Sequence, residues 1–135
     1  MELEFFEKLL ITALRKFDKF FNAYNYSISG ITYGDRDGDS IDYRSNNSGK
    51  EIHIVFTWTG EGISMDLVFY KKKTFFQKQF FNINNSYYLF PELENLKKEI
   101  TEENYNIVIE SYFQFINKYF IPVVRGDKWI DDIKK

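Results

Sequence analysis

The sequence predicts an α+β domain in which helices cover one face of an antiparallel sheet. Apolar residues follow a helical period over residues 2–22, alternate with a period of two within residues 26–83, and return to a helical period in the last third. This order of elements gives two layers when the helices pack on one sheet face. Two domains would each bury too small a core in 135 residues, so we expect a single domain spanning residues 1–135.

The first helix is predicted from apolar residues at steps of three and four, with charged residues on the opposite side. Phenylalanine dominates this stripe, and the chain as a whole is 20% aromatic, so we expect a core built mainly from rings. Such a stripe is typical of a helix that covers a sheet. Its members are Phe5, Phe6, Leu9, Leu10, Ala13, Leu14, Phe17, Phe20 and Phe21.

A hairpin over residues 52–69 gives the clearest strand signal. Apolar residues alternate with His53, Val55 and Thr57 before the loop, and with Ser64, Asp66 and Val68 after it. Both apolar sets must face one core, so the loop must hold an even number of residues. A two-residue turn at Gly60-Glu61 and a four-residue loop both pair Trp58 with Ile63 and Phe56 with Met65.

Further strands are predicted at 26–33 and 40–45, joined by a loop at 34–39, and a turn follows at 46–49. A fifth strand is predicted at 75–83, which gives a meander of four or five strands. The sheet face away from the helices would carry His53, Thr57, Ser64, Asp66 and Tyr70, together with Val55 and Val68. If no tail or second subunit covers this face, it is where we expect a partner to bind.

The C-terminal third predicts helices again. A short helix is expected after Pro91, formed by Leu89, Leu93, Leu96 and Ile100. Thr101 is the expected N-cap of a longer helix, which Pro122 would stop. The apolar stripe of that helix contains Tyr105, Val108, Ile109, Tyr112, Phe113, Ile116, Tyr119 and Phe120. We expect the tail to turn back so that Trp129 packs on the body of the domain.

Composition argues against several classes of function. The net charge of −2 lacks the basic excess of nucleic-acid binders, and the absence of cysteine excludes disulfides, thiol catalysis and thiolate metal sites. The start, Met1-Glu2-Leu3-Glu4, lacks the positive region of a signal peptide, and no run of about 18 apolar residues exists. We therefore expect a cytoplasmic protein that binds neither membranes nor nucleic acid.

The loop from Asp35 to Ser40 resembles the start of a calcium-binding EF-hand loop, because Asp35, Asp37 and Asp39 stand at alternate positions. The match fails at the sixth position, where Ser40 replaces the required glycine, and at the twelfth, where Asn46 replaces the bidentate carboxylate. We interpret the segment as a solvated hairpin loop and expect no metal.

His53 is the only histidine, and in the predicted register Asp66 lies diagonal to it across the hairpin. No Gly-x-Ser-x-Gly nucleophile motif accompanies them, and the further ligands of a zinc site are absent. A basic and aromatic segment at 71–78 is interpreted as a lysine-rich edge rather than a site for single-stranded nucleic acid or lipid. We therefore expect no catalytic, cofactor-binding or metal-binding residue, and no enzyme.

The order of elements and the closing stretch at 118–129, KYFIPVVRGDKW, resemble small bacterial α+β proteins. Some of these are grouped as immunity proteins of polymorphic toxin systems. The resemblance implies a non-enzymatic protein of the bacterial cytoplasm that neutralises a cognate toxin by binding it. It assigns a role to no particular residue.

The leading hypothesis is therefore a protein-binding module, in which acidic side chains steer a basic partner such as a toxin domain. Its candidate partner-binding residues are Asp35, Asp37, Asp39, Asp42, His53 and Asp66. One alternative is a structural protein that forms a symmetric homodimer through the uncovered face or an exposed edge strand. Another is a small-ligand binder or hydrolase that uses carboxylates and tyrosines in a cleft between sheet and helices.

Overall fold

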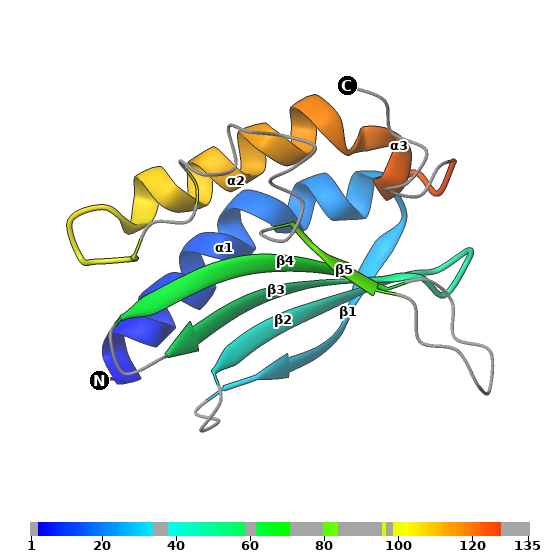
Figure 1. The fold of residues 1–135 in the computed structure, drawn as a ribbon. Helices are drawn as coiled ribbons and strands as arrows, with labels where there is room; N and C mark the ends of the chain where they lie inside the picture. Colours follow the sequence, from blue (N-terminus) through cyan, green and yellow to red (C-terminus); the bar gives the residue numbers. More distant parts are fainter. Residues whose placement is uncertain are drawn as a thin grey trace.

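The computed structural model describes residues 3–33, 38–58, 62–70, 80–83, 96 and 99–127, and within them it confirms the α+β fold. Helix α1 (Leu3–Ala23) comes first and lies on the same side of the sheet as the C-terminal helices (Figure 1). The strands are β1 (Tyr26–Thr32), β2 (Asp39–Ser45), β3 (Glu51–Trp58), β4 (Ile63–Tyr70) and β5 (Phe80–Asn82). Helices α2 (Tyr105–Tyr119) and α3 (Ile121–Val124) follow.

The sheet is an antiparallel meander with the strand order β1-β2-β3-β4-β5. The predicted hairpin register is confirmed, since Trp58 lies opposite Ile63 and Phe56 opposite Met65. The fifth strand is shorter than predicted in its described part, and residues 71–79 lie outside the described residues. Side chains alternate along a strand. This register therefore places the apolar residues at even positions of β3 and at odd positions of β4 on the side of the sheet that faces the helices.

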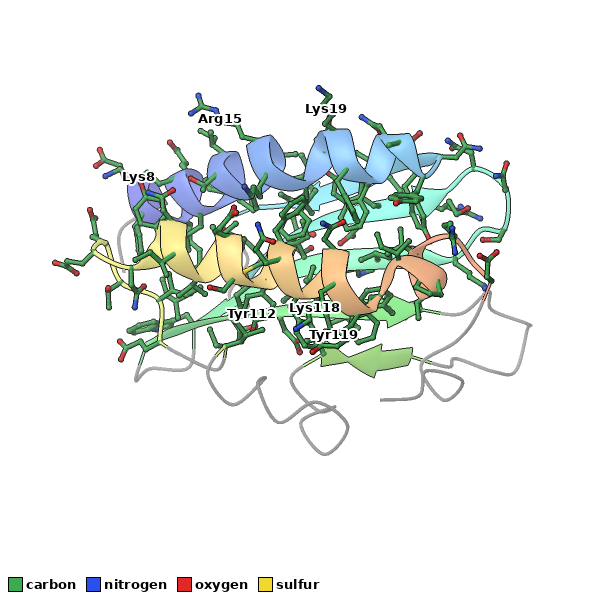
Figure 2. All side chains as sticks on the ribbon, turned by 90° about the horizontal axis from the view of Figure 1, so that it is seen from above. Lys8, Arg15, Lys19, Tyr112, Lys118 and Tyr119 are labelled. Atoms are coloured by element: carbon green, nitrogen blue, oxygen red, sulfur yellow. The ribbon has the colours of Figure 1, made fainter. Side chains whose placement is uncertain are left out.

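The two long helices lie side by side and run in the same direction. Contacts advance together along both of them: Phe5 meets Tyr105 near their starts, and Phe17 meets Phe113 further on. Helix α1 contacts β1 and β2, whereas α2 lies over the β4 side of the sheet (Figure 2). No helix among the described residues is long and apolar enough to cross a membrane.

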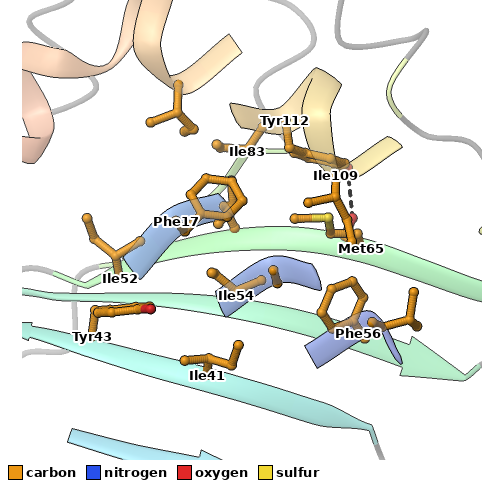
Figure 3. Packing of buried hydrophobic residues seen from close by; sticks show 14 of the residues in the cluster. Phe17, Ile41, Tyr43, Ile52, Ile54, Phe56, Met65, Ile83, Ile109 and Tyr112 are labelled. Carbon is orange, nitrogen blue, oxygen red and sulfur yellow. Dashed lines mark hydrogen bonds between the residues drawn. The ribbon is translucent and has the colours of Figure 1, made fainter. Parts of the chain in front are cut away.

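The core lies between this helix layer and the sheet, and it is rich in rings, as predicted. Phe17 and Phe21 have no exposed surface, and the Phe21 ring centroid lies 4.7 Å from that of Tyr43 on β2. Aliphatic side chains of the three central strands belong to the same buried cluster as these rings, and Figure 3 shows several of them with Phe17 and Tyr43. They include Ile41, Ile52, Ile54, Met65 and Leu67.

Buried tyrosine hydroxyls connect the two layers. Tyr112 of α2 donates a hydrogen bond to the Met65 carbonyl oxygen of β4 at 2.7 Å (Figure 3). Tyr26 of β1 donates to the Val124 carbonyl oxygen of α3 at 2.8 Å, and Tyr43 of β2 donates to Asp18 Oδ1 of α1 at 3.0 Å. A buried hydroxyl without a partner is costly, so each bond favours one placement of a helix on its strand.

The start of α2 differs from the N-cap prediction, because the helix begins at Tyr105 with Asn104, not Thr101, as its N-cap. The structure also corrects the end of the helix predicted before it. Thr101 Oγ1 accepts the Asn104 backbone N–H at 3.3 Å, and Asn104 Oδ1 accepts the Thr101 N–H at 2.8 Å, so these two residues close the turn that precedes the helix. Ile100 is not helical: its N–H donates to the Ile63 carbonyl oxygen in an isolated antiparallel bridge. Local spacing could not reveal this distant pairing.

At the C-terminal end, α2 stops at Tyr119, before Pro122, which lies in the first turn of α3. This position suits proline because first-turn N–H groups have no intrahelical acceptor. Phe115, which the predicted stripe omitted, is also buried, and its ring centroid lies 5.4 Å from that of Phe120. Leu89, Pro91, Leu93 and Trp129 lie outside the described residues.

We expect Tyr26→Phe to destabilise the fold at pH 7 by about 1–2 kcal/mol, because the Val124 carbonyl oxygen loses its buried donor. Burial raises the pKa of Tyr26 from 10.0 to about 12. Between these values the unfolded chain releases the proton while the folded chain keeps it, so the tyrosine's contribution to stability falls as pH rises, by at most ~1.4 kcal/mol per pH unit. Urea unfolding at several pH values measures both effects.

Tyr24→Phe is the matched control. Tyr24 is half-buried against Phe20, and its hydroxyl makes no hydrogen bond among the described residues. This change should alter stability at pH 7 by less than about 0.5 kcal/mol. A stability difference between wild type and Tyr26→Phe that stays constant from neutral to strongly alkaline pH would contradict the predicted role of burial.

Candidate functional site

The candidate site lies on the sheet face that points away from α1 and α2, called here the outer face. It is formed by alternate residues of β3 and β4, as the sequence predicted, and of β2, and its central side chains are half-buried. Ser64 is exposed, whereas Val68 retains only 7% of its surface. The outer face consists of Ser40, Asp42, Arg44, Glu51, His53, Val55, Thr57, Ser64, Asp66, Val68 and Tyr70.

His53 lies between two carboxylates. Its Nδ1 is 3.3 Å from Asp42 Oδ1, and its Nε2 is 2.9 Å from Glu51 Oε1. The backbone explains both contacts: Asp42 stands directly opposite His53 in the β2–β3 pairing, and Glu51 precedes His53 by two residues on the same face. The side chains are 20–27% exposed, so solvent screens these contacts only in part.

Tyr70 completes the group from the neighbouring strand. It stands opposite Glu51 in the β3–β4 pairing, and its ring centroid lies 4.5 Å from that of His53. Burial raises the pKa of Tyr70, and the negative charges of Asp42 and Glu51 raise it further, because each disfavours the phenolate. The phenol ring packs against the imidazole with the two ring planes inclined at 48°.

Glu51 Oε1 lies at hydrogen-bond distance from His53 Nε2, whereas the buried Asp42 Oδ1 makes no hydrogen bond among the described residues. A neutral imidazole has one N–H and can donate to one carboxylate, whereas the protonated ring has two and can donate to both. The predicted diagonal placement of Asp66 is confirmed by the register, in which Asp66 faces Val55. The ring nitrogens of His53 nevertheless contact Asp42 and Glu51, while Asp66 Oδ1 accepts the Leu67 backbone N–H at 2.8 Å.

The predicted acidic residues separate into different environments. Asp42 and Asp66 lie on the outer face with His53, but Asp39 at the start of β2 is only 2% exposed. The preceding Gly38 has φ +135°, and a Cβ there would lie 2.2 Å from the Phe56 carbonyl oxygen, so the chain enters β2 pressed against β3. The buried carboxylate of Asp39 can therefore influence a partner only through its electrostatic field. Asp35 and Asp37 lie outside the described residues.

Glu51 is the residue of this group that the sequence reasoning missed. The available signal was its spacing of two from His53, which places both on one strand face. Its ion pair depends on side-chain orientation, which the alternation of the strand does not specify. Among the described residues, no group of three or more histidine, cysteine or acidic side chains is placed to hold a metal ion.

We expect Asp42→Asn and Glu51→Gln each to lower the pKa of Tyr70 towards the ordinary value of 10.0 without reaching it. Each change removes a negative charge that opposes the phenolate, whereas burial, the largest cause, remains. NMR titration of ¹³Cζ-labelled tyrosine measures the shift.

The matched control for this titration is Glu7→Gln. Glu7 accepts the Tyr33 hydroxyl at 2.8 Å, and this bond is the largest cause of the raised pKa of Tyr33. The control should lower the pKa of Tyr33 and leave that of Tyr70 unchanged. If all three substitutions changed the pKa of Tyr70 equally, the negative charges of Asp42 and Glu51 would not be what raises it.

Comparison with known proteins identifies no relative: no protein-family model matches the chain, and neither a curated protein nor a solved structure matches it significantly.

Proposed function

We propose that this chain is a non-enzymatic protein-binding module that receives a basic partner on its outer face. The observation that carries the proposal is the group formed by Asp42, His53 and Glu51, which presents two carboxylates on a sheet face turned away from the helices. The architecture resembles that of small bacterial α+β proteins, some of which are immunity proteins. The specific form of the proposal is therefore an immunity protein of the bacterial cytoplasm, whose partner is the basic domain of a cognate toxin.

The composition of the outer face supports this role. Val55 and Thr57 are half-buried and continue the outer face along β3 from His53, and Ser64 and Asp66 continue it onto β4. Protein interfaces commonly combine a partly apolar centre with polar groups that align the partners. Lysine or arginine side chains of a partner could bind Asp42, Glu51 and Asp66, which would also accelerate association through long-range attraction.

Site-specific photocrosslinking in native cells tests this proposal. Benzoylphenylalanine at Ser64, an exposed position of the outer face, should yield one discrete covalent conjugate whose mass identifies the partner. The same probe at Lys19, on the exposed side of α1 (Figure 2), should not. The purified partner should then bind the wild type more tightly than Asp42→Asn and more weakly as salt increases.

Two outcomes would reject the proposal. One is a Ser64 probe that forms no conjugate while the protein is folded and abundant in the cell. The other is a partner whose affinity is equal for wild type, Asp42→Asn and Glu51→Gln, since the acidic group would then play no part in recognition.

Self-association is the second candidate function, and an apolar strip along the sheet edge favours it. β1 is the edge strand, and Ile28, Ile31 and Tyr33 along it are 42%, 51% and 43% exposed. The register shift between Ile28 and Gly30 keeps Ile28 and Ile31 on the same side of the sheet. Their partners on β2 are the buried Tyr43 and Ile41, respectively. Ile11 of α1, 47% exposed, follows Glu7 by one helical turn, and Glu7 bonds Tyr33 beside this strip.

If the strip joins two copies, sedimentation velocity over a range of concentrations will show a monomer–dimer equilibrium for the wild type. Ile31→Lys should abolish it, because a charged edge opposes strand pairing. Ile107→Lys is the control, since Ile107 is 69% exposed on α2 and should leave the dimer intact. A wild-type chain that remains monomeric at high concentration removes this candidate.

A further inference from the structure

A polar cup lies where β1, the end of β2 and the turn before β3 meet. Its volume is about 520 Å³, and its lining includes Ser27, Ile28, Arg44, Asn47, Ser48 and Gly49. Hydroxyl and amide side chains dominate the lining, and among its described residues Arg44 alone is charged. This volume is within the range of about 300–1,000 Å³ that small-molecule sites occupy.

Arg44 has no ionic partner in the described part of the chain. Its cross-strand neighbour on β3 is Glu51, the natural partner for a salt bridge. Glu51 instead directs Oε1 to His53 Nε2 at 2.9 Å, and no hydrogen bond or ion pair within the described residues involves the guanidinium. Five N–H donors therefore remain available at the cup.

The turn beside Arg44 is held in place by its own hydrogen bonds. Ser45 Oγ accepts the backbone N–H groups of Asn47 and Ser48 at 3.3 and 3.2 Å, and Asn25 Nδ2 donates to Asn47 Oδ1 at 3.0 Å. Gly49 has φ +75°, and a Cβ there would lie 3.7 Å from Arg44 Nη2, so the guanidinium rests near the glycine. The cup wall is thus formed before any ligand arrives.

These bonds leave specific donors without acceptors among the described residues. Asn47 uses its side-chain oxygen but not its Nδ2, and Ser48 Oγ accepts the Lys50 N–H without donating its own proton. Together with Arg44, three side chains of the lining can therefore donate hydrogen bonds to one ligand. Such a set of donors around one positive charge matches an oxyanion, which accepts charge-assisted hydrogen bonds and pairs bidentately with arginine.

We infer that the cup binds the oxyanion group of a small ligand, a phosphomonoester or a carboxylate, through Arg44, Asn47 and Ser48. The carboxylates of Asp42 and Glu51 on the same face are turned to His53, which reduces their competition for Arg44. This inference does not depend on the proposed protein partner, because a small anion needs only the cup.

The test is a ¹⁵N NMR titration of the full chain at constant ionic strength, with glycerol 3-phosphate, inorganic phosphate and acetate as separate probes. We expect saturable shifts at the Arg44 Nε–H, the Asn47 side-chain amide and the Ser48 amide. Tighter binding of the two phosphates identifies a phosphoryl ligand, whereas tighter binding of acetate identifies a carboxylate. If glycerol 3-phosphate binds more tightly than inorganic phosphate, the part of the cup beyond the oxyanion site contributes to the affinity.

Two variants and a control make the result specific. Arg44→Gln should weaken binding at least about tenfold. Asn47→Asp should weaken it similarly, because it adds a repelling carboxylate yet preserves the acceptor of Asn25 Nδ2. Lys19→Gln, which removes an exposed positive charge from α1, should change nothing. The inference fails if the shifts do not saturate for any probe, or if Lys19→Gln weakens binding as much as Arg44→Gln.

Discussion

Burial of Phe17, Phe21 and Tyr43 between α1 and the sheet is the interaction on which the remaining structure depends. A fully buried apolar side chain contributes about 1.5–3 kcal/mol relative to an exposed one, so these rings dictate which face of β2 and β3 meets the helices. Since strand side chains alternate, the same choice sends Asp42, Glu51 and His53 to the opposite face. The outer face is thus a consequence of how the core packs.

A core of rings raises a second requirement, because tyrosine carries a hydroxyl that needs a partner when buried. Tyr26, Tyr43 and Tyr112 each reach across the layers, to α3, α1 and β4 respectively. Apolar contacts alone would tolerate small shifts of a helix along the sheet, whereas these bonds have defined lengths and directions. They therefore help to set the helix positions, and through them the strand positions beneath the outer face.

On the outer face, competition for charged partners links the two proposed sites. His53 contacts both nearby carboxylates, and Glu51 is thereby drawn away from Arg44, its neighbour across the strands. The contacts of His53 with Asp42 and Glu51 therefore form the acidic group and also leave the Arg44 guanidinium available at the cup. A change that releases Glu51 from His53 would allow Glu51 to pair with Arg44, which would alter both surfaces together.

The sequence by itself determined the helix–sheet–helix order, the faces of β3 and β4 and their mutual register, because periodicity and loop parity are local properties. Only the tertiary structure decided that Asp42 stands against His53, that Glu51 turns to the same ring, that Asp39 is buried and that Ile100 bridges to Ile63. Those contacts join separate segments, and alternation assigns a residue to a face without choosing its neighbour across the strands.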